Sequence, residues 1–469
     1  MTLKVLYLDI DSLRPDHLGC YGYGRPTAPH IDRLAAQGMR FDRCYTSDSP
    51  CMPSRAALFS GVPGIQNGVV THGPRGQVLY PHGPTLPGAL RAAGVRTGVV
   101  STFGRHPSPW FLVGWDEVHD PTGWGFQQVP GSAITERALG FIERHAAEDF
   151  YLHVHFWDVH GWHDAPEGCL AAVSAAGTGT LPALPTEEQV QSHQGMAAWH
   201  CARLAGVRDR SDVEAMYDGY DAEIRYVDHH IGQILQRLED LGILEDTLVL
   251  LSADHGQEFG EHGVYFEHGS VYEGTAHVPL IARYPRWIRS GRADEGLIYQ
   301  LDIASTVLEA FGVAVPKQWE SRSLGPRLRG EATDARPYLV CGHGLYMAQR
   351  AVVQGPWKLV RTLHAGHWDV PPTELFAPLE DPWEQVNLAA EYPEVVRELE
   401  GRLLEWEYAH PSPNGVDPMR VNAALGPQGI VGGGARQLDR LRQMKAGQVA
   451  PRPSSARKPE VDVAWSGSW

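Results

Sequence analysis

The chain has 469 residues, more than a single hydrophobic core usually holds, and this length predicts two or three domains. Its 40 basic and 56 acidic side chains give a formal net charge of −16. A field of that sign repels a polyanion, so we exclude a nucleic-acid groove and expect any small anionic substrate to need a locally positive site.

The spacing of the cysteines and the lack of long apolar runs exclude further classes of protein. The six cysteines show no CxxC spacing, which argues against a zinc ribbon and against a disulfide framework. No run approaches the roughly 18 apolar residues of a membrane span. The opening segment, MTLKVLYLDI, has too short an apolar core for a secretory signal and no small-residue cleavage site. We therefore expect a cytoplasmic protein with no membrane partner.

Strand and helix signals alternate through the first 335 residues. Gly94 is the expected stop of the first clear helix. Because strands alternate with helices, residues 1–335 are predicted to form an α/β domain with a central, largely parallel sheet flanked by helices. The expected strands and helices are, in chain order, strand 3–8, helix 85–94, strand 95–100, strand 150–156, helix 219–241 and strand 247–253.

The alternation of strand and helix signals is interrupted once within this domain and ends after it. Between about 164 and 212, Gly, Ala, Pro and Ser dominate, which indicates an insertion that shapes access to a site. Over 336–410, short strand signals and a helix expected at 391–407 predict a small antiparallel α+β domain. The segment 411–469 holds many Pro and Gly residues, so we expect an extended tail or an arm that mediates homo-oligomerisation.

The segment SDSPCMPSRAALFSG (47–61) places a thiol at the start of a predicted helix. Pro53 suits the first turn of a helix, and Gly61 suits its exit. Cys51 would then lie beside unpaired backbone N–H groups at the positive end of the helix dipole, which favours an anion and lowers a thiol pKa. Arg55 projects from the same face. Taken alone, this spacing also fits a capping cysteine and a surface arginine.

The longer string CxPSR resembles the signature of type I sulfatases, the formylglycine-dependent enzymes of the alkaline phosphatase superfamily. Further stretches resemble blocks of that family in the same order, so that the resemblance spans about residues 3 to 408. They are DSLRPDHLGCYGYGRPTAPHIDRLAAQGMRF (11–41), LGILEDTLVLLSADHGQEFGEHG (241–263), YEGTAHVPLIARYP (272–285), YQLDIASTVLEAFGV (299–313) and ELFAPLEDPWEQVNLA (374–389).

The resemblance implies an alkaline phosphatase-like sandwich and a sulfatase that hydrolyses sulfate esters or sulfamates. It also implies that a formylglycine-generating enzyme oxidises Cys51 to an aldehyde during maturation. One hydroxyl of the aldehyde hydrate attacks sulfur, and deprotonation of the other expels sulfate; a thiol has no such second hydroxyl. A hard divalent cation, most simply Ca²⁺ with Mn²⁺ or Mg²⁺ as alternatives, would hold the hydrate and the sulfate oxygens.

The metal ligands implied by the match are Asp11, Asp254, His255 and the residue derived from Cys51. The family commonly has two adjacent acids in its first segment, whereas the second position here is Ser12. Asp9 lies on the same face of an extended strand as Asp11. It is therefore either the missing ligand or an acid that orients Asp11 or Arg55.

Three histidines match a shell that, with Arg55, neutralises and protonates the reacting group. His106 is the best match in GRH (104–106), and His160 is the match in HFWDVHGWH (155–163). His268 in EHGSVYE (267–273) stands where the family commonly has a lysine. Histidine is a weaker permanent cation than lysine but a better proton donor near neutral pH.

Two features concern the substrate, which we expect to be a small sulfated sugar or aryl sulfate. Four tryptophans near these segments fit either an apolar wall for the substrate or ordinary core packing: Trp110, Trp115, Trp157 and Trp162. The stretch GVPGIQNGVVTHG (61–73) resembles the QNG stretch of glycosaminoglycan N-sulfatases, which directs attention to Asn67 and His72.

Two other functions are compatible with parts of the sequence. Phosphonate monoester and phosphodiester hydrolases resemble this chain, use the same aldehyde and pair their first aspartate with a non-acid, so Ser12 and the long segment after Tyr408 favour them. A non-catalytic binding protein that kept the fold is the second alternative. A set of five residues argues against it when taken together: Asp11, Cys51, Arg55, Asp254 and His255.

Overall fold

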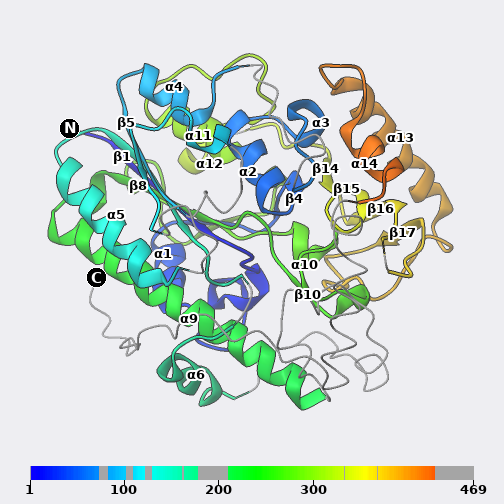
Figure 1. Cartoon of the computed structure of the whole chain (residues 1–469), viewed down its shortest axis with the longest axis horizontal. Helices are drawn as coiled ribbons and strands as arrows, with labels where there is room; N and C mark the ends of the chain where they lie inside the picture. Colours follow the sequence, from blue (N-terminus) through cyan, green and yellow to red (C-terminus); the bar gives the residue numbers. More distant parts are fainter. Residues whose placement is uncertain are drawn as a thin grey trace.

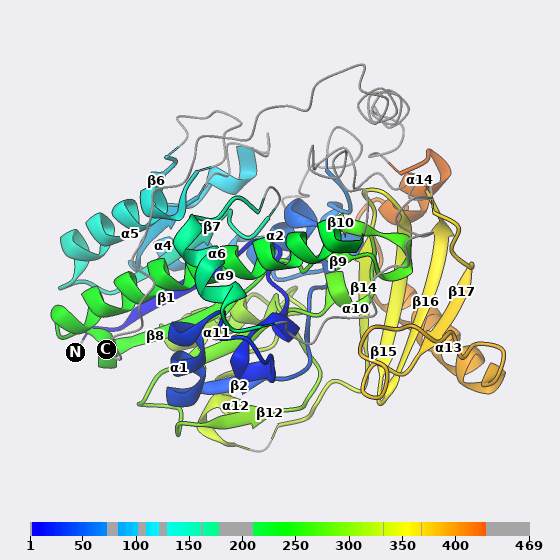
Figure 2. The ribbon, with the colours of Figure 1, turned by 90° about the horizontal axis from the view of Figure 1, so that it is seen from below.

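The computed structural model describes residues 2–72, 83–101, 109–121, 129–160, 163–177, 210–331, 333–366 and 368–427. Over these ranges a large, mostly parallel sheet carries helices on both faces (Figure 1). A second sheet lies to one side of it (Figure 2). The arrangement confirms the predicted α/β class with an additional antiparallel sheet. Among the described helices, none combines the length and the apolar character that crossing a membrane requires.

The first strand, β1 (Lys4–Ile10), lies inside the main sheet and pairs in parallel with β7 (Phe150–Phe156) and β8 (Thr247–Ser252). Every residue of these three strands is buried and most are apolar, because helices cover the sheet on both sides. The strand order is β12, β2, β11, β8, β1, β7, β5, β6, and only β11 runs antiparallel to its neighbours. The remaining strands are β2 (Met39–Phe41), β5 (Arg96–Val100), β6 (Glu117–His119), β11 (Leu280–Arg283) and β12 (Arg292–Asp294).

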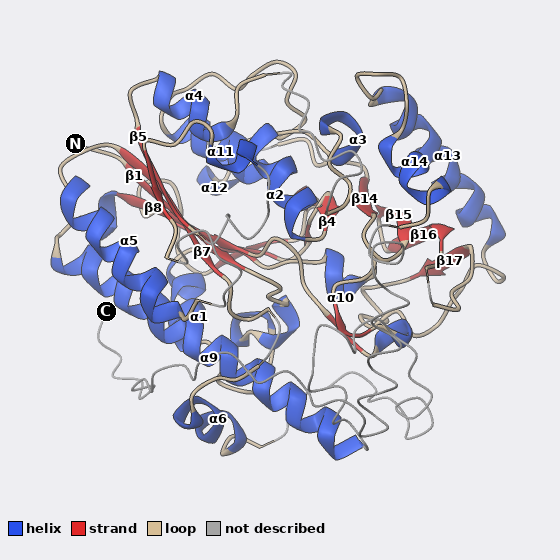
Figure 3. Cartoon of the chain, in the orientation of Figure 1, coloured by secondary structure: helices blue, strands red, loops and turns tan. Residues whose placement is uncertain are grey.

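Two layers of helices enclose this sheet (Figure 3). One face carries α1 (Pro29–Gln37), α5 (Gly131–His145) and α9 (Arg210–Asp240), with α6 (Glu167–Ser174) packed on α9. The opposite face carries α2 (Cys51–Ser60), α4 (Leu86–Ala92), α11 (Asp302–Ala310) and α12 (Gly325–Arg329). Short helices α3 (Gly64–Asn67) and α10 (Glu273–Ala276) follow turns near the second sheet.

The second sheet ties the start of the chain to its C-terminal part. Strands β14 (Leu339–His343), β15 (Ala348–Gln354), β16 (Trp357–His364) and β17 (Thr373–Phe376) are antiparallel, and α13 (Pro393–Ala409) packs on them. Strand β4 (Asp48–Ser49) joins the edge in parallel with β14. Since β4 directly precedes α2, the C-terminal sheet helps to hold the beginning of that helix. Two short pairs complete the strands: β3 (Cys44–Tyr45) with β13 (Ile298–Tyr299), and β9 (Glu258–Phe259) with β10 (Tyr265–Glu267).

The elements expected from the sequence recur at nearly the same positions, with differences at two ends. The helix expected at 219–241 begins earlier, at Arg210, because its apolar stripe continues through the buried Val213 and Tyr217. The expected tail opens with α14 (Pro418–Ala424), whose Met419 and Asn422 are buried. Most of the expected insertion, residues 178–209, and the segment 428–469 lie outside the described residues.

Candidate active site

Side chains from three parallel strands meet at one edge of the main sheet. Asp11 directly follows β1, Asp254 follows β8 and His160 follows β7. Parallel strands that pair with one another carry their carboxyl ends to the same edge, so these residues converge although they are far apart in the sequence. The beginning of α2 lies at this edge as well, with Cys51 as its first residue.

Helix α2 begins and ends as the sequence predicts. Pro50 precedes its first residue, and Pro53 lies in its first turn. Gly61 ends it with φ +66°, and a Cβ atom there would lie 2.2 Å from the ring of Trp319. No side chain of the helix caps its own N-terminus; instead the N–H of Met52 donates a hydrogen bond of 3.1 Å to His72 Nε2. His72 therefore supports the turn that carries Cys51.

Four predicted ligands form one compact group. One ligand atom from each of Asp11, Cys51, Asp254 and His255 lies within 4.8 Å of the others, and all four side chains are buried. The N–H at Nδ1 of His255 donates to Gly256 O (2.8 Å), which leaves the Nε2 lone pair directed at Cys51 Sγ, 3.1 Å away. Burial, the neighbouring His268 and Arg55 lower the His255 pKa to about 3, so this ring is neutral and available as a ligand.

Arg55 is a fully buried cation shared by three buried carboxylates. Its Nε donates to Asp9 Oδ2 and its Nη2 to Asp11 Oδ2, both at 3.1 Å. The same Nη2 lies 3.0 Å from Asp254 Oδ2 and 2.7 Å from the Nε2 of His155. The sequence-based alternative of a surface arginine is therefore wrong, since Arg55 has no exposed area.

The charge balance of this group fits a divalent cation. Burial raises the pKa of Asp11, but Arg55 and His155 lower it by more, so that this pKa lies well below its usual range. Burial, with Asp11 and Asp9 adding to it, raises the Asp254 pKa well above its usual range against the pull of Arg55. Asp254 Oδ2 accepts no hydrogen bond within the described chain, although it lies 3.0 Å from Arg55 Nη2 as an ion pair. One guanidinium thus only partly compensates three buried carboxyl groups, and a metal would stabilise the ionised form of Asp254.

Asp9 lies behind this group and is not one of its four members. Its Oδ2 contacts Arg55 Nε and His153 Nε2, each at 3.1 Å. Burial opposes ionisation of Asp9, but Arg55 and His153 outweigh it and lower the pKa. This geometry matches the second of the two roles open for Asp9, that of an acid that orients Arg55.

The thiol of Cys51 departs from the expectation of a lowered pKa. Burial raises its pKa well above the usual range, and the carboxylates of Asp11 and Asp254 raise it further, while Arg55 only partly opposes them. The side chain is 1% exposed. The helix terminus therefore does not make Cys51 a reactive thiolate, and the unmodified residue is a poor nucleophile at neutral pH.

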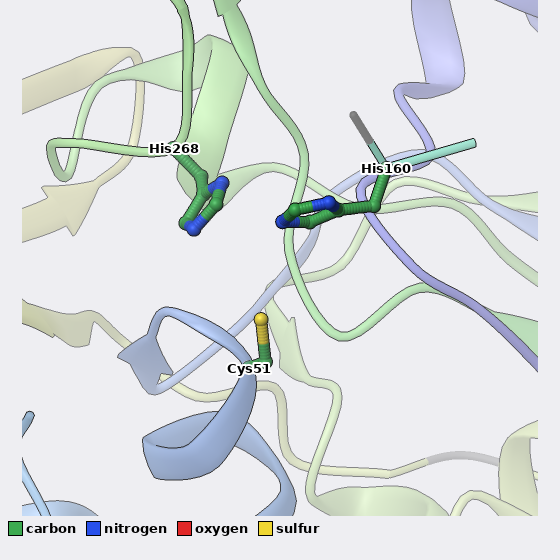
Figure 4. A group of neighbouring side chains, drawn as sticks. All are labelled: Cys51, His160 and His268. Carbon is green, nitrogen blue, oxygen red and sulfur yellow. The ribbon is translucent and has the colours of Figure 1, made fainter. Parts of the chain in front are cut away.

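Two of the three predicted histidines lie above Cys51. One ligand atom from each of Cys51, His160 and His268 lies within 4.8 Å of the others, and Figure 4 shows the two imidazoles facing each other over the sulfur. The Nδ1 atom of His268 is 3.0 Å from Glu267 Oε1. Burial opposes protonation of His268, but Glu267 raises its pKa above the usual value. His106 lies outside the described residues.

Several site residues escaped the sequence analysis. His153 and His155 point toward the acids from β7, and the alternation in FYLHVHF is the signal that could have identified them. His155 also contacts Ser101 Oγ at 2.9 Å, and burial with Arg55 lowers its pKa to about 4. His343 on β14 contacts Ser49 Oγ at 2.9 Å. No local pattern indicates His343, because only the pairing of β14 with β4 brings it near the site.

The tryptophans and the asparagine singled out in the sequence lie partly in the core and partly next to the site. Trp115 packs against Phe59, Tyr151 and His153, and its indole N–H donates to Phe111 O, so it belongs to the core. Trp157 lies 4.8 Å, centroid to centroid, from His160 and therefore borders the site. Asn67 bonds to Val62 O and the N–H of Val69 and thereby shapes the loop after α2. Nothing is described for the side chains of Trp110 and Trp162.

Comparisons with known proteins agree with this geometry. A sulfatase family model matches residues 4–313, and a model described as N-sulphoglucosamine sulphohydrolase, C-terminal, matches residues 260–409. A curated relative, the N-acetylglucosamine-6-O-sulfatase of Bacteroides thetaiotaomicron, is 25% identical, and the match covers 84% of each chain.

Two solved structures share the fold. One protein, solved in complex with its substrate D-glucosamine-2-N,6-O-disulfate, has a TM-score of 0.71 at 22% identity and covers 89% of this chain and 99% of its own. The phosphonate monoester hydrolase from Silicibacter pomeroyi has a TM-score of 0.73 at 20% identity and covers 89% and 96%. These likenesses confirm the predicted alkaline phosphatase-like sandwich.

Proposed function

Because the chain belongs to the sulfatase family and is a sulfuric ester hydrolase, we propose that it removes sulfate from a small sulfated amino sugar, using formylglycine made from Cys51. One observation carries this proposal: Asp11, Cys51, Asp254 and His255 come within 4.8 Å of one another beside a buried arginine. A residue 51 bearing oxygen in place of sulfur would sit among ligands suited to a divalent cation.

Asp11, Asp254, His255 and the oxygen of residue 51 would hold that cation. When bound, it supplies positive charge that favours ionisation of a hydroxyl and neutralises sulfate oxygens. Ca²⁺ is the simplest choice for two carboxylates, whereas the imidazole of His255 gives Mn²⁺ a nitrogen ligand that suits it better. Mg²⁺ is the third candidate.

The other side chains have separate tasks in this proposal. Arg55 keeps Asp11 ionised and holds Asp11 and Asp254 in place, and Asp9 together with His153 fixes Arg55. His160 and His268 lie over residue 51 on the side away from the helix, where a leaving group would depart. The raised pKa of His268 suits it to protonate the departing oxygen or nitrogen near neutral pH. We keep His106 as a third member of this shell on the basis of the sequence resemblance.

Support for an amino sugar comes from several sides. The curated relative is named for N-acetylglucosamine 6-sulfate, the C-terminal family model is named for N-sulphoglucosamine, and a structural neighbour was solved with a disulfated glucosamine. We therefore take glucosamine carrying a 6-O-sulfate or an N-sulfate as the first substrates to assay. Trp157 is buried against His160, so it supports that imidazole and offers no surface to the sugar ring.

The test uses the full chain coexpressed with a formylglycine-generating enzyme. Mass spectrometry of the peptide that contains residue 51 measures conversion of the thiol to the aldehyde. We expect converted, metal-loaded protein to release sulfate from at least one of the two glucosamine sulfates, and protein made without the maturation enzyme to be inactive. Fully converted protein that releases no sulfate from sugar or aryl sulfates would contradict the proposal.

A second function, hydrolysis of phosphonate monoesters or phosphodiesters, is favoured by Ser12. This residue has φ +62°, and its hydroxyl donates to Asp11 Oδ1 at 2.9 Å where sulfatases commonly have a second acid. Replacing an acid by a neutral group lowers the negative charge near the metal. The ratio of kcat/KM for an aryl sulfate to that for an aryl phosphonate monoester, measured on the same converted sample, decides between the two functions.

A further inference from the structure

The three side chains of Figure 4 form a donor set that shares Cys51 with the group of Asp11, Asp254 and His255 but contains no carboxylate. A thiol and two imidazoles are the ligands that Zn²⁺ and similar borderline-soft cations select, whereas carboxylate oxygens suit Ca²⁺ or Mg²⁺. We propose that the chain, while Cys51 is still a thiol, binds Zn²⁺ through Cys51, His160 and His268, and that conversion of Cys51 abolishes this site.

The geometry of the three donors is close to that of a tetrahedral site. Their ligand atoms lie within 4.8 Å of one another. Zinc bonds of about 2.0–2.3 Å place neighbouring ligands roughly 3.5 Å apart, so side-chain movements of about 1 Å bring the three together. The fourth position is left for water, which can enter because His160 is only half-buried.

Glu267 gives this donor set a feature that metal-binding histidines commonly have. Its Oε1 lies 3.0 Å from Nδ1 of His268, so the proton of that ring is held at Nδ1 and Nε2 is left as the donor atom. Figure 4 shows a ring nitrogen of His268 directed to the space above Cys51. Glu267 is itself 1% exposed, and a buried carboxylate in this position orients the ring and strengthens it as a ligand.

Binding exchanges a proton for the metal. The S–H bond of Cys51 breaks, a Zn–S bond forms, and the proton leaves to the solvent buffer, as does the Nε2 proton of any His268 that is in the imidazolium form; nothing is oxidised or reduced. The thiol donates to His255 Nε2 at 3.1 Å, and this hydrogen bond is lost as the thiolate turns its charge toward the metal. A formylglycine at position 51 has no sulfur to offer, so the same two histidines would then no longer hold zinc.

This inference concerns the chain before conversion and does not itself require sulfatase chemistry; only its consequence for activity rests on the proposed function. A zinc ion on Cys51 occupies the space in which the proposed nucleophile and proton donors would meet the substrate. Unconverted chains would therefore be a distinct, zinc-stabilised and inactive population.

The test uses full-length protein expressed without a maturation enzyme, its thiol verified by mass spectrometry, with Co²⁺ as the optical probe and Zn²⁺ as the competitor. We expect one Co²⁺ per chain with a thiolate charge-transfer band, displaced by Zn²⁺ and retained in excess Ca²⁺. Cys51→Ser should remove the band. His160→Asn and His268→Asn should weaken Zn²⁺ binding at least 10-fold, and Glu267→Gln by about 10- to 100-fold.

Matched controls separate this site from its neighbours. Cys20→Ser removes a thiol that is partly exposed and belongs to neither group of candidate ligands, and it should leave the titration unchanged. Asp11→Asn and Asp254→Asn test the carboxylate group. Absence of the thiolate band, or its loss in the aspartate variants with retention in both histidine variants, overturns the proposal. Activity of converted enzyme is measured separately, so neither result decides the other.

Discussion

The sulfur of Cys51 lies 3.1 Å from Nε2 of His255, although 204 positions separate the two residues in the chain. The contact exists because β8 and β1 are neighbours in the main sheet and the start of α2 lies at their carboxyl ends. When oxygen replaces this sulfur, the same imidazole nitrogen faces that oxygen. His255 is thus the member of the group that decides how soft the proposed metal site is.

Replacing His255 by asparagine tests this choice of metal. The amide oxygen of His255→Asn is a hard ligand, so we expect the variant to retain metal and to shift its preference from Mn²⁺ toward Ca²⁺. His255→Ala offers no ligand atom and should bind either ion about 10- to 100-fold more weakly than the wild type. Calorimetric titration of converted, metal-stripped protein measures both affinities. Equal affinities in all three proteins would exclude His255 as a ligand.

Asp9 and Asp11 make a matched pair for separating a positioning acid from a ligand. We expect Asp11→Asn to lose metal affinity strongly, and Asp9→Asn to keep it within a few fold while kcat falls about 10- to 100-fold, because Arg55 loses one of its anchors. Metal titration and steady-state kinetics on the two variants measure this difference. A parallel loss of metal affinity in both would make Asp9 a direct ligand.

Arg55 should tolerate no substitution, not even by lysine. A lysine carries the charge but cannot contact Asp9, Asp11 and Asp254 at once with a planar fork. Removing one partner of a buried ion pair typically costs about 3–5 kcal/mol, so Arg55→Ala should lower the free energy of unfolding by about that amount and Arg55→Lys by less. Urea unfolding measures both; the exposed Arg137→Ala is the control, with a change near zero. Arg55→Ala with wild-type stability would show that the carboxylates need no cation.

Much of the site follows from the sequence because its signals are local. Apolar runs that end in acids identify Asp11 and Asp254 at the carboxyl ends of buried strands, and Pro53 with Gly61 delimits α2 around Cys51. These features depend on backbone preferences and on burial within short segments. The resemblance to the sulfatase family then added His160, His255 and His268, which these local signals alone do not identify.

What the sequence left open depends on contacts between distant segments. The raised pKa of Cys51 results from burial beside Asp11 and Asp254, whereas the helix-terminus argument considers only its own turn. Likewise, β4 consists of two residues whose strand character exists only because β14 pairs with them, so no periodicity reveals His343 beside Ser49. Long-range pairing of this kind leaves no local pattern to read.

Gly61 should be among the least replaceable residues around α2. Its φ of +66° disfavours any L-residue by about 1–2 kcal/mol, and a Cβ would overlap the ring of Trp319. We therefore expect Gly61→Ala to lower the free energy of unfolding by more than about 2 kcal/mol and to reduce kcat by displacing Cys51. Thermal unfolding measures the first effect. Gly355→Ala, at φ +58° with open space around its Cβ, isolates the backbone cost; equal losses in the two variants would show that Trp319 contributes nothing.

Asp228, on α9, makes the stability of the fold pH-dependent. Its carboxyl group is buried beneath the first turn of α1, where it accepts hydrogen bonds from the N–H groups of His30 (3.1 Å) and Ile31 (2.8 Å). Burial outweighs these bonds and raises its pKa to about 8. The folded chain therefore holds a proton that the unfolded chain releases near pH 4.

The free energy of unfolding therefore falls as pH rises through this range. The folded state binds more protons between about pH 4 and pH 8, so the stability contributed by Asp228 is complete at the acid end and is lost as pH rises, by at most about 1.4 kcal/mol per pH unit. Asp228→Asn cannot ionise and should match the wild type near pH 4 but exceed its free energy of unfolding at pH 8. Glu239→Gln, on the exposed surface of the same helix α9, should leave the slope unchanged. Parallel pH profiles for wild type and Asp228→Asn would mean that the carboxyl is already ionised in the folded protein and that the two backbone N–H groups suffice to stabilise its charge.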